Sequence, residues 1–176
     1  MESDLFKFFS STFVNSIILL GGVIATLWAI RSARIATLTT IDNNRVIAQQ
    51  TETALLMFHS RADDMLRAGY KTIRELHDCN GDNIVAYATD ATKRASDKNE
   101  QIRYVLNHWE RIAVCVSHKI YCEDILKDSM YTTVVNVFEQ ADPFIRALRK
   151  IAGTETIYQD LETMVKRWKD KPLQKR

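Results

Sequence analysis

The chain has 176 residues, of which 46% are hydrophobic and 26% charged, with only 5 Gly and 2 Pro. Sandwiches and barrels need a turn about every ten residues, usually built on Gly or Pro, so this composition excludes them and predicts an all-α protein. The formal net charge of +2 predicts no strong field for nucleic acid or acidic substrates. The three cysteines, Cys79, Cys115 and Cys122, lack a framework spacing and indicate free thiols in a reducing compartment.

The first predicted element is a single transmembrane helix within residues 1–30. No charged residue occurs between Lys7 and Arg31. As a helix, the uncharged segment 8–30 spans about 34 Å, which is enough to cross a hydrocarbon core of about 30 Å. A buried core helix and a cleaved signal peptide are the alternatives. The segment is apolar nearly all round and is followed, not preceded, by arginines, so both alternatives are disfavoured.

The charges that flank this helix predict its orientation. Arg31, Arg34 and Arg45 follow the apolar segment, whereas only Lys7 precedes it. The positive-inside rule therefore places the N-terminus outside and the long C-terminal part in the cytoplasm. Arg31 and Arg34 are candidate lipid contacts.

Residues 31–79 are predicted to continue the membrane helix as a long juxtamembrane helix, with a bend near Ile41 to Asn44. A stop is expected at Asn80-Gly81-Asp82. An apolar stripe at helical spacing runs along this helix and consists of Ile47, Ala54, Phe58, Ala62, Met65, Gly69, Ile73 and Leu76. The stripe can be an ordinary two-layer core or an intermolecular coiled coil, and the second alternative predicts self-association through residues 45–76.

Residues 80–169 are predicted to form a small helical bundle. Helical patterns cover 83–119, with an interruption near 96–98, then 124–141, 143–152 and 154–168. Asp142-Pro143 is interpreted as a helix start, Gly153 as a stop and Thr154 as the next cap. The predicted inward residues are Ile102, Val105, Leu106, Trp109, Ile112, Ala113, Val116, Leu126, Met130, Val134, Val137, Phe138, Ile157, Leu161, Met164, Val165 and Trp168.

Residues 166–176 form a basic region, and its last part, residues 170–176, is predicted to be a tail. It can be a solvated terminus, or it can contact an anionic lipid surface. A nucleic-acid arm is less favoured, because no aromatic residues interleave with the cations that follow Trp168. The candidate lipid contacts here are Lys166, Arg167, Lys169 and Lys171.

No motif for catalysis is present. The chain lacks a P-loop and the GxGxxG, GxSxG and HExxH patterns, which predicts a protein that is not an enzyme. His108, Cys115, His118 and Cys122 have near-helical spacing, but one straight helix cannot wrap a tetrahedral zinc ion, so no metal or cofactor is predicted. An unrecognised enzyme centred on His108, Glu110, His118 and Tyr121 remains an alternative.

The candidate interaction surface consists of Asn107, Glu110, Tyr121 and Glu123. Asn107 and Glu110 lie one helical turn apart on the helix that carries the Trp109 core face. Glu110 is expected to be half-buried and to form a structural ion pair with a cation such as Arg103 or Arg146, rather than to act in acid–base catalysis. The adjacent pairs Asp63-Asp64 and Glu123-Asp124 are poor catalytic carboxylates and better helix N-terminal charges.

Three segments support a resemblance: ARIATLTTI at 33–41, LNHWERIAVCVSHKIYCEDIL at 106–126 and DPFIRALR at 142–149. With them the chain resembles a family of short bacterial and prophage proteins that carry a domain of unknown function. The family tends to have glycines where Cys115 and Lys119 stand. The matching positions are Leu106, Asn107, Glu110, Ile112, Ala113, Val114, Ile120, Tyr121, Glu123, Pro143, Phe144 and Ile145.

The resemblance implies a bacterial inner membrane setting and no known reaction. The resulting hypothesis is a single-pass membrane anchor that presents a cytoplasmic helical interaction or scaffold domain to a protein partner. A phage or prophage protein acting in exclusion or defence at the host membrane is one form of it. The alternatives are a membrane-tethered regulator that uses its basic tail on nucleic acid or anionic lipid, and a membrane-bound enzyme.

Overall fold

The structure is a computed structural model that describes residues 2–78 and 83–174, with side chains described for residue 16 and from residue 19 onward in those ranges. These described residues form seven helices and no strand, which confirms the predicted all-α class. Two compact units meet between Ile47 and Ala48. The predicted divisions after residues 30, 79 and 169 remain predictions.

The first unit is the N-terminal part of helix α1 (Glu2–Ala62). Every side chain from residue 19 to residue 47 is exposed, including large apolar ones such as Trp28 at 73%. Threonine hydroxyls in this unit donate to carbonyl oxygens four residues earlier, as Thr26 does to Gly22 at 2.7 Å and Thr37 to Ala33 at 2.9 Å. The helix backbone therefore satisfies these hydroxyls without water.

The continuous helix predicted for residues 31–79 is broken at Asp63, not near Ile41 to Asn44, and helix α2 (Asp64–Asp78) follows. Asp63 caps α2, since its Oδ1 accepts from the Leu66 amide at 3.0 Å. Its Oδ2 accepts from the Tyr104 hydroxyl at 2.8 Å. Burial raises the pKa of Asp63, but these hydrogen bonds outweigh it and hold the pKa below 3.8. Asp63-Asp64 therefore lies at a helix N-terminus, where the prediction of one helix over residues 31–79 did not place it.

This break divides the predicted continuous stripe. Gly69, Ile73 and Leu76 of α2 are buried, whereas Phe58 of α1 is 74% exposed and Ala54 is also exposed. A helix that ends and restarts in a new direction cannot keep one seam, so the stripe as one buried face is wrong.

Two short helices, α3 (Ala86–Thr89) and α4 (Ala91–Arg94), precede the central helix α5 (Asp97–Ser117). Ser96 precedes α5 and accepts from the Asn99 amide at 3.5 Å, which confirms the interruption predicted near 96–98. A further break occurs at Asp90, whose Oδ1 accepts from the Lys93 amide at 3.0 Å. The predicted stop at residues 80–82 lies outside the described residues.

Helix α6 (Glu123–Ala152) is continuous through Pro143, so the predicted restart at Asp142 is wrong. A proline within a helix removes one backbone hydrogen bond. Here the apolar residues on both sides of it are buried, including Ala141, Phe144 and Leu148. Burial of this continuous apolar face outweighs the tendency of Asp142-Pro143 to start a new helix. The helix ends at Gly153 with φ +64°, as expected for a left-handed terminal residue.

The last helix, α7 (Gln159–Asp170), begins five residues after Thr154, so the predicted cap is wrong. The chain is held as a loop because Arg149 donates from Nε and Nη2 to the Ile157 carbonyl at 2.9 and 2.7 Å. Tyr158 then adopts φ +58°, which is not helical backbone.

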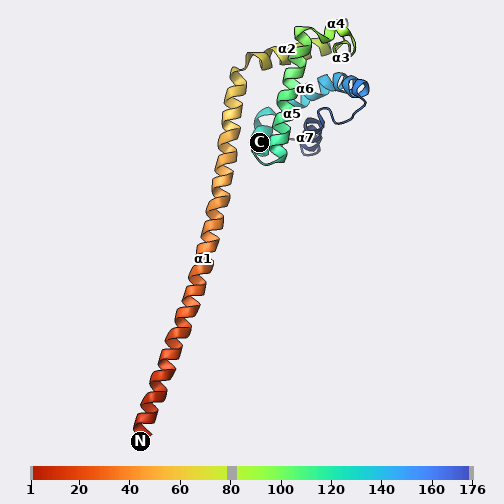
Figure 1. The fold of residues 1–176 in the computed structure, drawn as a ribbon. Helices are drawn as coiled ribbons and strands as arrows, with labels where there is room; N and C mark the ends of the chain where they lie inside the picture. Colours follow the sequence, from red (N-terminus) through yellow and green to blue (C-terminus); the bar gives the residue numbers. More distant parts are fainter. Residues whose placement is uncertain (1, 79–82, 175–176) are drawn as a thin grey trace. The chain divides into compact units, whose positions relative to one another are not determined.

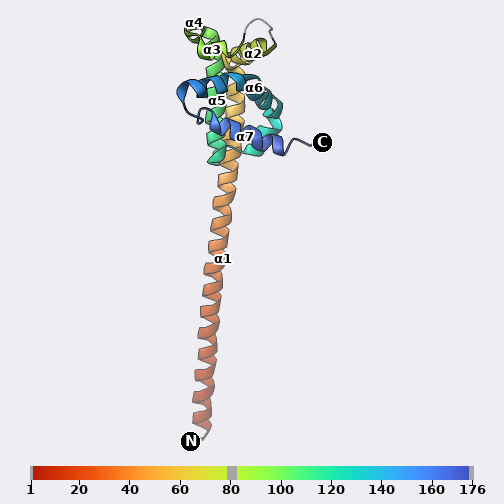
Figure 2. The same cartoon turned by 90° about the vertical axis from the view of Figure 1, so that its right-hand side faces the viewer.

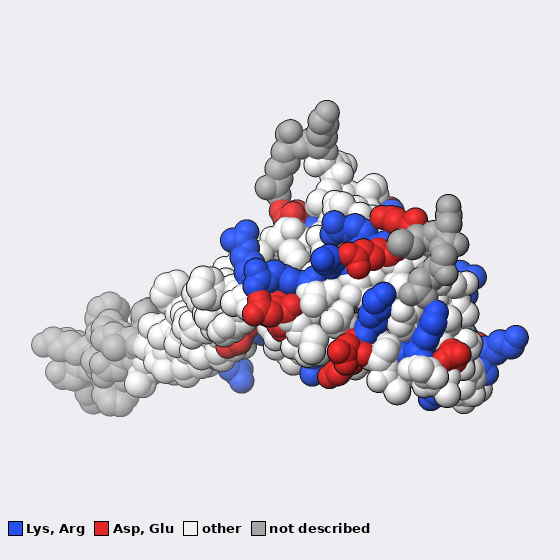
Figure 3. Space-filling view, turned by 90° about the horizontal axis from the view of Figure 1, so that it is seen from above, with Lys and Arg blue, Asp and Glu red and all other residues white. Residues whose placement is uncertain are grey.

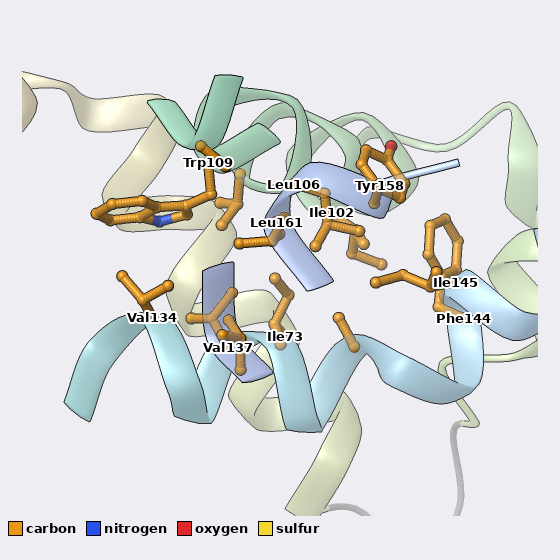
Figure 4. Packing of buried hydrophobic residues seen from close by; sticks show 14 of the residues in the cluster. Ile73, Ile102, Leu106, Trp109, Val134, Val137, Phe144, Ile145, Tyr158 and Leu161 are labelled. Carbon is orange, nitrogen blue, oxygen red and sulfur yellow. The ribbon is translucent and has the colours of Figure 1, made fainter. Parts of the chain in front are cut away.

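The core of the second unit surrounds α5, which packs against α2, α6 and α7, with α3 and α4 near its N-terminal end (Figures 1 and 2). Leu106 and Leu161 point into the space between α5, α6 and α7 (Figure 4), and the Trp109 indole donates to the Tyr70 hydroxyl of α2 at 2.9 Å. The predicted inward residues are buried, apart from Met130, Phe138 and Ile157, which are partly buried against the same core.

Candidate functional site

Glu110 caps a helix other than its own. From α5, its Oε2 accepts from the Leu161 amide at 2.8 Å and its Oε1 from the Asp160 amide at 3.3 Å. These amides belong to the first turn of α7, where backbone N–H groups have no partner within the helix. A carboxylate there also meets the positive end of the helix dipole.

The predicted ion pair of Glu110 with Arg103 or Arg146 is therefore wrong. Arg146 pairs instead with Asp142 at 2.8 Å, and the Arg103 guanidinium lies 6.0 Å from the centre of the Phe144 ring. Burial raises the pKa of Glu110 above 4.5, against the hydrogen bonds from Leu161 and Asp160. Because the folded-state pKa is raised, protonation of Glu110 adds to the stability of the fold. This protonation-linked contribution is complete below pH 4.5 and is lost as pH rises through the folded-state pKa.

Glu123 fastens the other end of α7. Its Oε1 accepts from the Trp168 indole Nε1 at 2.8 Å and from Arg167 Nε at 2.9 Å. The Trp168 side chain is buried, so its indole N–H needs this acceptor. Glu123 also lies in the first turn of α6, as predicted from the Glu123-Asp124 pair.

Most of the predicted lipid-contact cations near the C-terminus have carboxylate partners in the bundle. Lys166 pairs with Glu162 at 2.5 Å, Lys169 with Glu139 at 2.6 Å, and Arg167 with Glu123. On the face drawn in Figure 3, Lys and Arg side chains lie among Asp and Glu side chains rather than in one positive region.

Among the residues that the structure describes, no such carboxylate pairs with the remaining predicted lipid contacts, Lys171, Arg31 and Arg34. The Lys171 carbonyl accepts from the Lys127 ammonium, while its side chain is exposed. Arg31 and Arg34 are exposed on the first unit.

The four residues of the candidate interaction surface do not serve one surface. Asn107 is exposed on α5, whereas Tyr121 is half-buried and packs against the core. Burial raises the pKa of Tyr121 above 10.0. Glu110 and Glu123 hold α7. Of the four, Asn107 alone offers a side chain that is mostly open to a partner.

The residues considered for metal binding or catalysis are also apart. No group of three or more His, Cys, Asp and Glu side chains able to hold a metal ion occurs in the described part of the chain. His108 faces α1, with Nε2 3.4 Å from Ser60 Oγ, and burial, followed by the charge of Arg111, lowers its pKa below 6.5. Glu110 is engaged with α7, and His118 is exposed.

A cavity of about 600 Å³ lies in the second unit, where sequence reasoning placed no site. Its walls come from the C-terminal turns of α1 and from α2, α5 and α6. Trp109 and Ile112 of α5 contribute apolar surface, and Tyr70 accepts from Trp109 Nε1 at 2.9 Å. Arg67 and Arg74, one heptad apart on α2, also line it. The seven-residue spacing of these two arginines indicates that they share one face of α2, and it is the feature of the sequence that points to this site.

Thr53 and Cys122 hold α1 beside this cavity. The Thr53 side chain is fully buried, and its hydroxyl accepts from the Cys122 amide at 2.8 Å. Thr53 in turn donates to the Gln49 carbonyl at 2.7 Å, so both hydrogen-bonding functions of the hydroxyl are used. The α1 wall is thus fixed at the N-terminal side of α6.

Comparison with known proteins gives a family and no named relative. Residues 16–168 match the family described as "Domain of unknown function (DUF4760)". No curated protein and no solved structure matches the chain. The match bears out the resemblance to a family with a domain of unknown function, and it includes most of the exposed apolar part of α1.

Proposed function

The chain belongs to the DUF4760 family, and from that premise we propose that it is a single-pass membrane protein that holds a helical binding module at the cytoplasmic face. One observation carries the proposal: the apolar side chains of α1 from Leu19 to Ile30 are exposed throughout. One helix of the described residues is long and apolar enough to cross a membrane. Exposed apolar surface of this extent is stable in lipid and costly in water.

Membrane insertion is tested by adding charge to this segment. Lysine at the centre of a membrane helix costs about 2.5 to 3.5 kcal/mol, so Ile24→Lys/Leu27→Lys should release the chain from membranes during carbonate extraction. Ile47→Lys, also exposed on α1, is the matched control and should stay in the membrane fraction. The proposal fails if wild-type chain is extracted by carbonate, or if the double variant fractionates like wild type.

Orientation is tested separately. Arg31 and Arg34 follow the apolar segment and support a cytoplasmic bundle by the positive-inside rule. In intact spheroplasts, an external protease should leave residues 48–176 uncut and should cut them after permeabilisation. Cleavage before permeabilisation would overturn the orientation. The resemblance given by residues 106–126 and 142–149 adds a bacterial inner membrane, and a phage or prophage role in exclusion or defence, to the same proposal.

A binding role without catalysis is part of this proposal. The ion pairs of Lys166, Arg167 and Lys169 leave less charge for nucleic acid or lipid, which favours a protein or small-molecule partner over the basic-tail alternative. Of the self-association predicted for residues 45–76, only the α1 part, before Asp63, is supported, because Phe58 and Leu55 are exposed whereas Ile73 and Leu76 are buried in the bundle. Cross-linking in membranes should give dimers that Phe58→Ser removes, and unchanged dimers in that variant would exclude this face.

A further inference from the structure

We infer that the cavity between α1, α2, α5 and α6 binds a small anionic amphiphile, a molecule with an apolar body and a single phosphate or carboxylate head. Its volume of about 600 Å³ is within the range of small-molecule sites, about 300 to 1,000 Å³. The inference rests on the proposed binding role, but it does not depend on membrane insertion.

The apolar part of the ligand fits the lining contributed by three helices. Leu56 and Met57 come from α1, Trp109 and Ile112 from α5, and Met130 from α6. Leu56, Met57 and Met130 are only partly buried, so part of their surface is open to an occupant. Methionine side chains adapt to ligand shape because they are unbranched and polarisable.

The charge of the lining selects an anionic head. Arg61, Arg67 and Arg74 line the cavity, and no Asp or Glu does so among the residues that the structure describes. Arg67 is already paired with Asp64. Arg61 and Arg74 have no carboxylate within ion-pair distance in the same described ranges, so their guanidinium groups are available. A guanidinium binds phosphate or carboxylate through two parallel hydrogen bonds.

A neutral donor accompanies these cations. The Tyr70 oxygen accepts from Trp109 Nε1, so the hydroxyl proton of Tyr70 is not used in that bond and can be donated into the cavity. Burial raises the pKa of Tyr70 to about 12, which keeps this proton in place near neutral pH. The Thr133 hydroxyl of α6 adds a further donor to the lining, whereas the Ser129 hydroxyl beside it already donates to the Ile125 carbonyl at 2.8 Å.

The probes are octyl phosphate, 1-octanol and inorganic phosphate, which carry both parts of the ligand, the apolar part alone and the head alone. Full-length chain is placed in phosphatidylcholine nanodiscs, and equilibrium dialysis against radiolabelled probe is corrected with empty nanodiscs. We expect saturable binding of one octyl phosphate per chain, at least about tenfold tighter than either of the other probes.

Three variants test the residues. Arg61→Gln/Arg74→Gln should weaken octyl phosphate binding about tenfold, while 1-octanol binding stays the same. Arg94→Gln/Lys150→Gln removes the same charge at exposed positions outside the cavity and should bind like wild type. Thr133→Trp should fill the cavity and reduce binding of both octyl probes. Circular dichroism verifies the fold of each variant.

Several outcomes would overturn the inference. They are no saturable octyl phosphate binding, equal binding of octyl phosphate and 1-octanol, equal binding of inorganic phosphate, or undiminished binding in Arg61→Gln/Arg74→Gln. Failure of the membrane proposal is seen independently in carbonate extraction. A chain that inserts but binds no octyl phosphate refutes only this inference.

Discussion

Gly69→Ala tests a close approach between α2 and α5. A Cβ at residue 69 would lie 2.4 Å from Val105 Cγ2 and 2.6 Å from the Gln101 carbonyl oxygen. Carbon atoms pack best at about 3.5 to 4.0 Å, so α2 and α5 would have to separate by about 1 Å. Overpacking of this kind costs about 1 to 3 kcal/mol, and a backbone contact places the cost near the upper value.

Alanine also stabilises a helix by about 1 kcal/mol relative to glycine. The net expectation for Gly69→Ala is therefore a loss of about 2 kcal/mol in the free energy of unfolding, measured by urea denaturation of the full chain followed by circular dichroism. Gly22→Ala, where an added Cβ meets no atom within 4 Å, is the control and should lose nothing. Unchanged or increased stability of Gly69→Ala would refute the packing argument.

Substitutions at three further residues test how α7 is held. Glu110→Ala should lower the free energy of unfolding by about 1 to 3 kcal/mol, because it leaves the Leu161 amide without its acceptor. Glu110→Gln should lower it less. Equal denaturation midpoints for wild type and Glu110→Ala would contradict the capping role. Glu123→Ala should cost a similar amount and alter Trp168 fluorescence, and a spectrum like that of wild type would exclude the indole hydrogen bond. Hydrogen bonds from Lys166 and then Arg149 hold the pKa of Glu162 below 4.5, so its stabilising contribution is present above pH 4.5 and is lost as pH falls through the folded value. The unfolding temperature should therefore fall less steeply with decreasing pH in Glu162→Gln than in wild type. Parallel falls in the two proteins would refute the role of Glu162 in acid sensitivity.

The helical class and the inward residues of α5 could be predicted because periodicity reports which side of a helix is buried. Trp109 and Leu106 are examples, and both are buried as expected. The break at Asp63 is present in the sequence as a helix-capping residue type. It is fixed, however, by the Tyr104 hydroxyl from α5, a contact that no local pattern contains.

Pro143 and Glu110 show where local signals are insufficient. Asp-Pro is a sound helix start in isolation, but buried residues on both sides of Pro143 keep α6 continuous. Glu110 was recognised as a half-buried carboxylate, yet its partners are amides of Asp160 and Leu161, fifty residues further along the chain. The cavity was missed because its walls come from four helices whose packing is not encoded in any one segment.

The attachment of α7 has a consequence for synthesis of the chain. Leu161, Met164, Val165 and Trp168 are almost fully buried, and α7 is translated after α5 and α6. Until these residues leave the ribosome, the earlier helices expose the apolar surface that α7 will cover, and the Glu110 and Glu123 carboxylates lack their α7 donors. A nascent chain is therefore most vulnerable to proteases and aggregation during this interval, and any stop codon before residue 159 would make that state permanent.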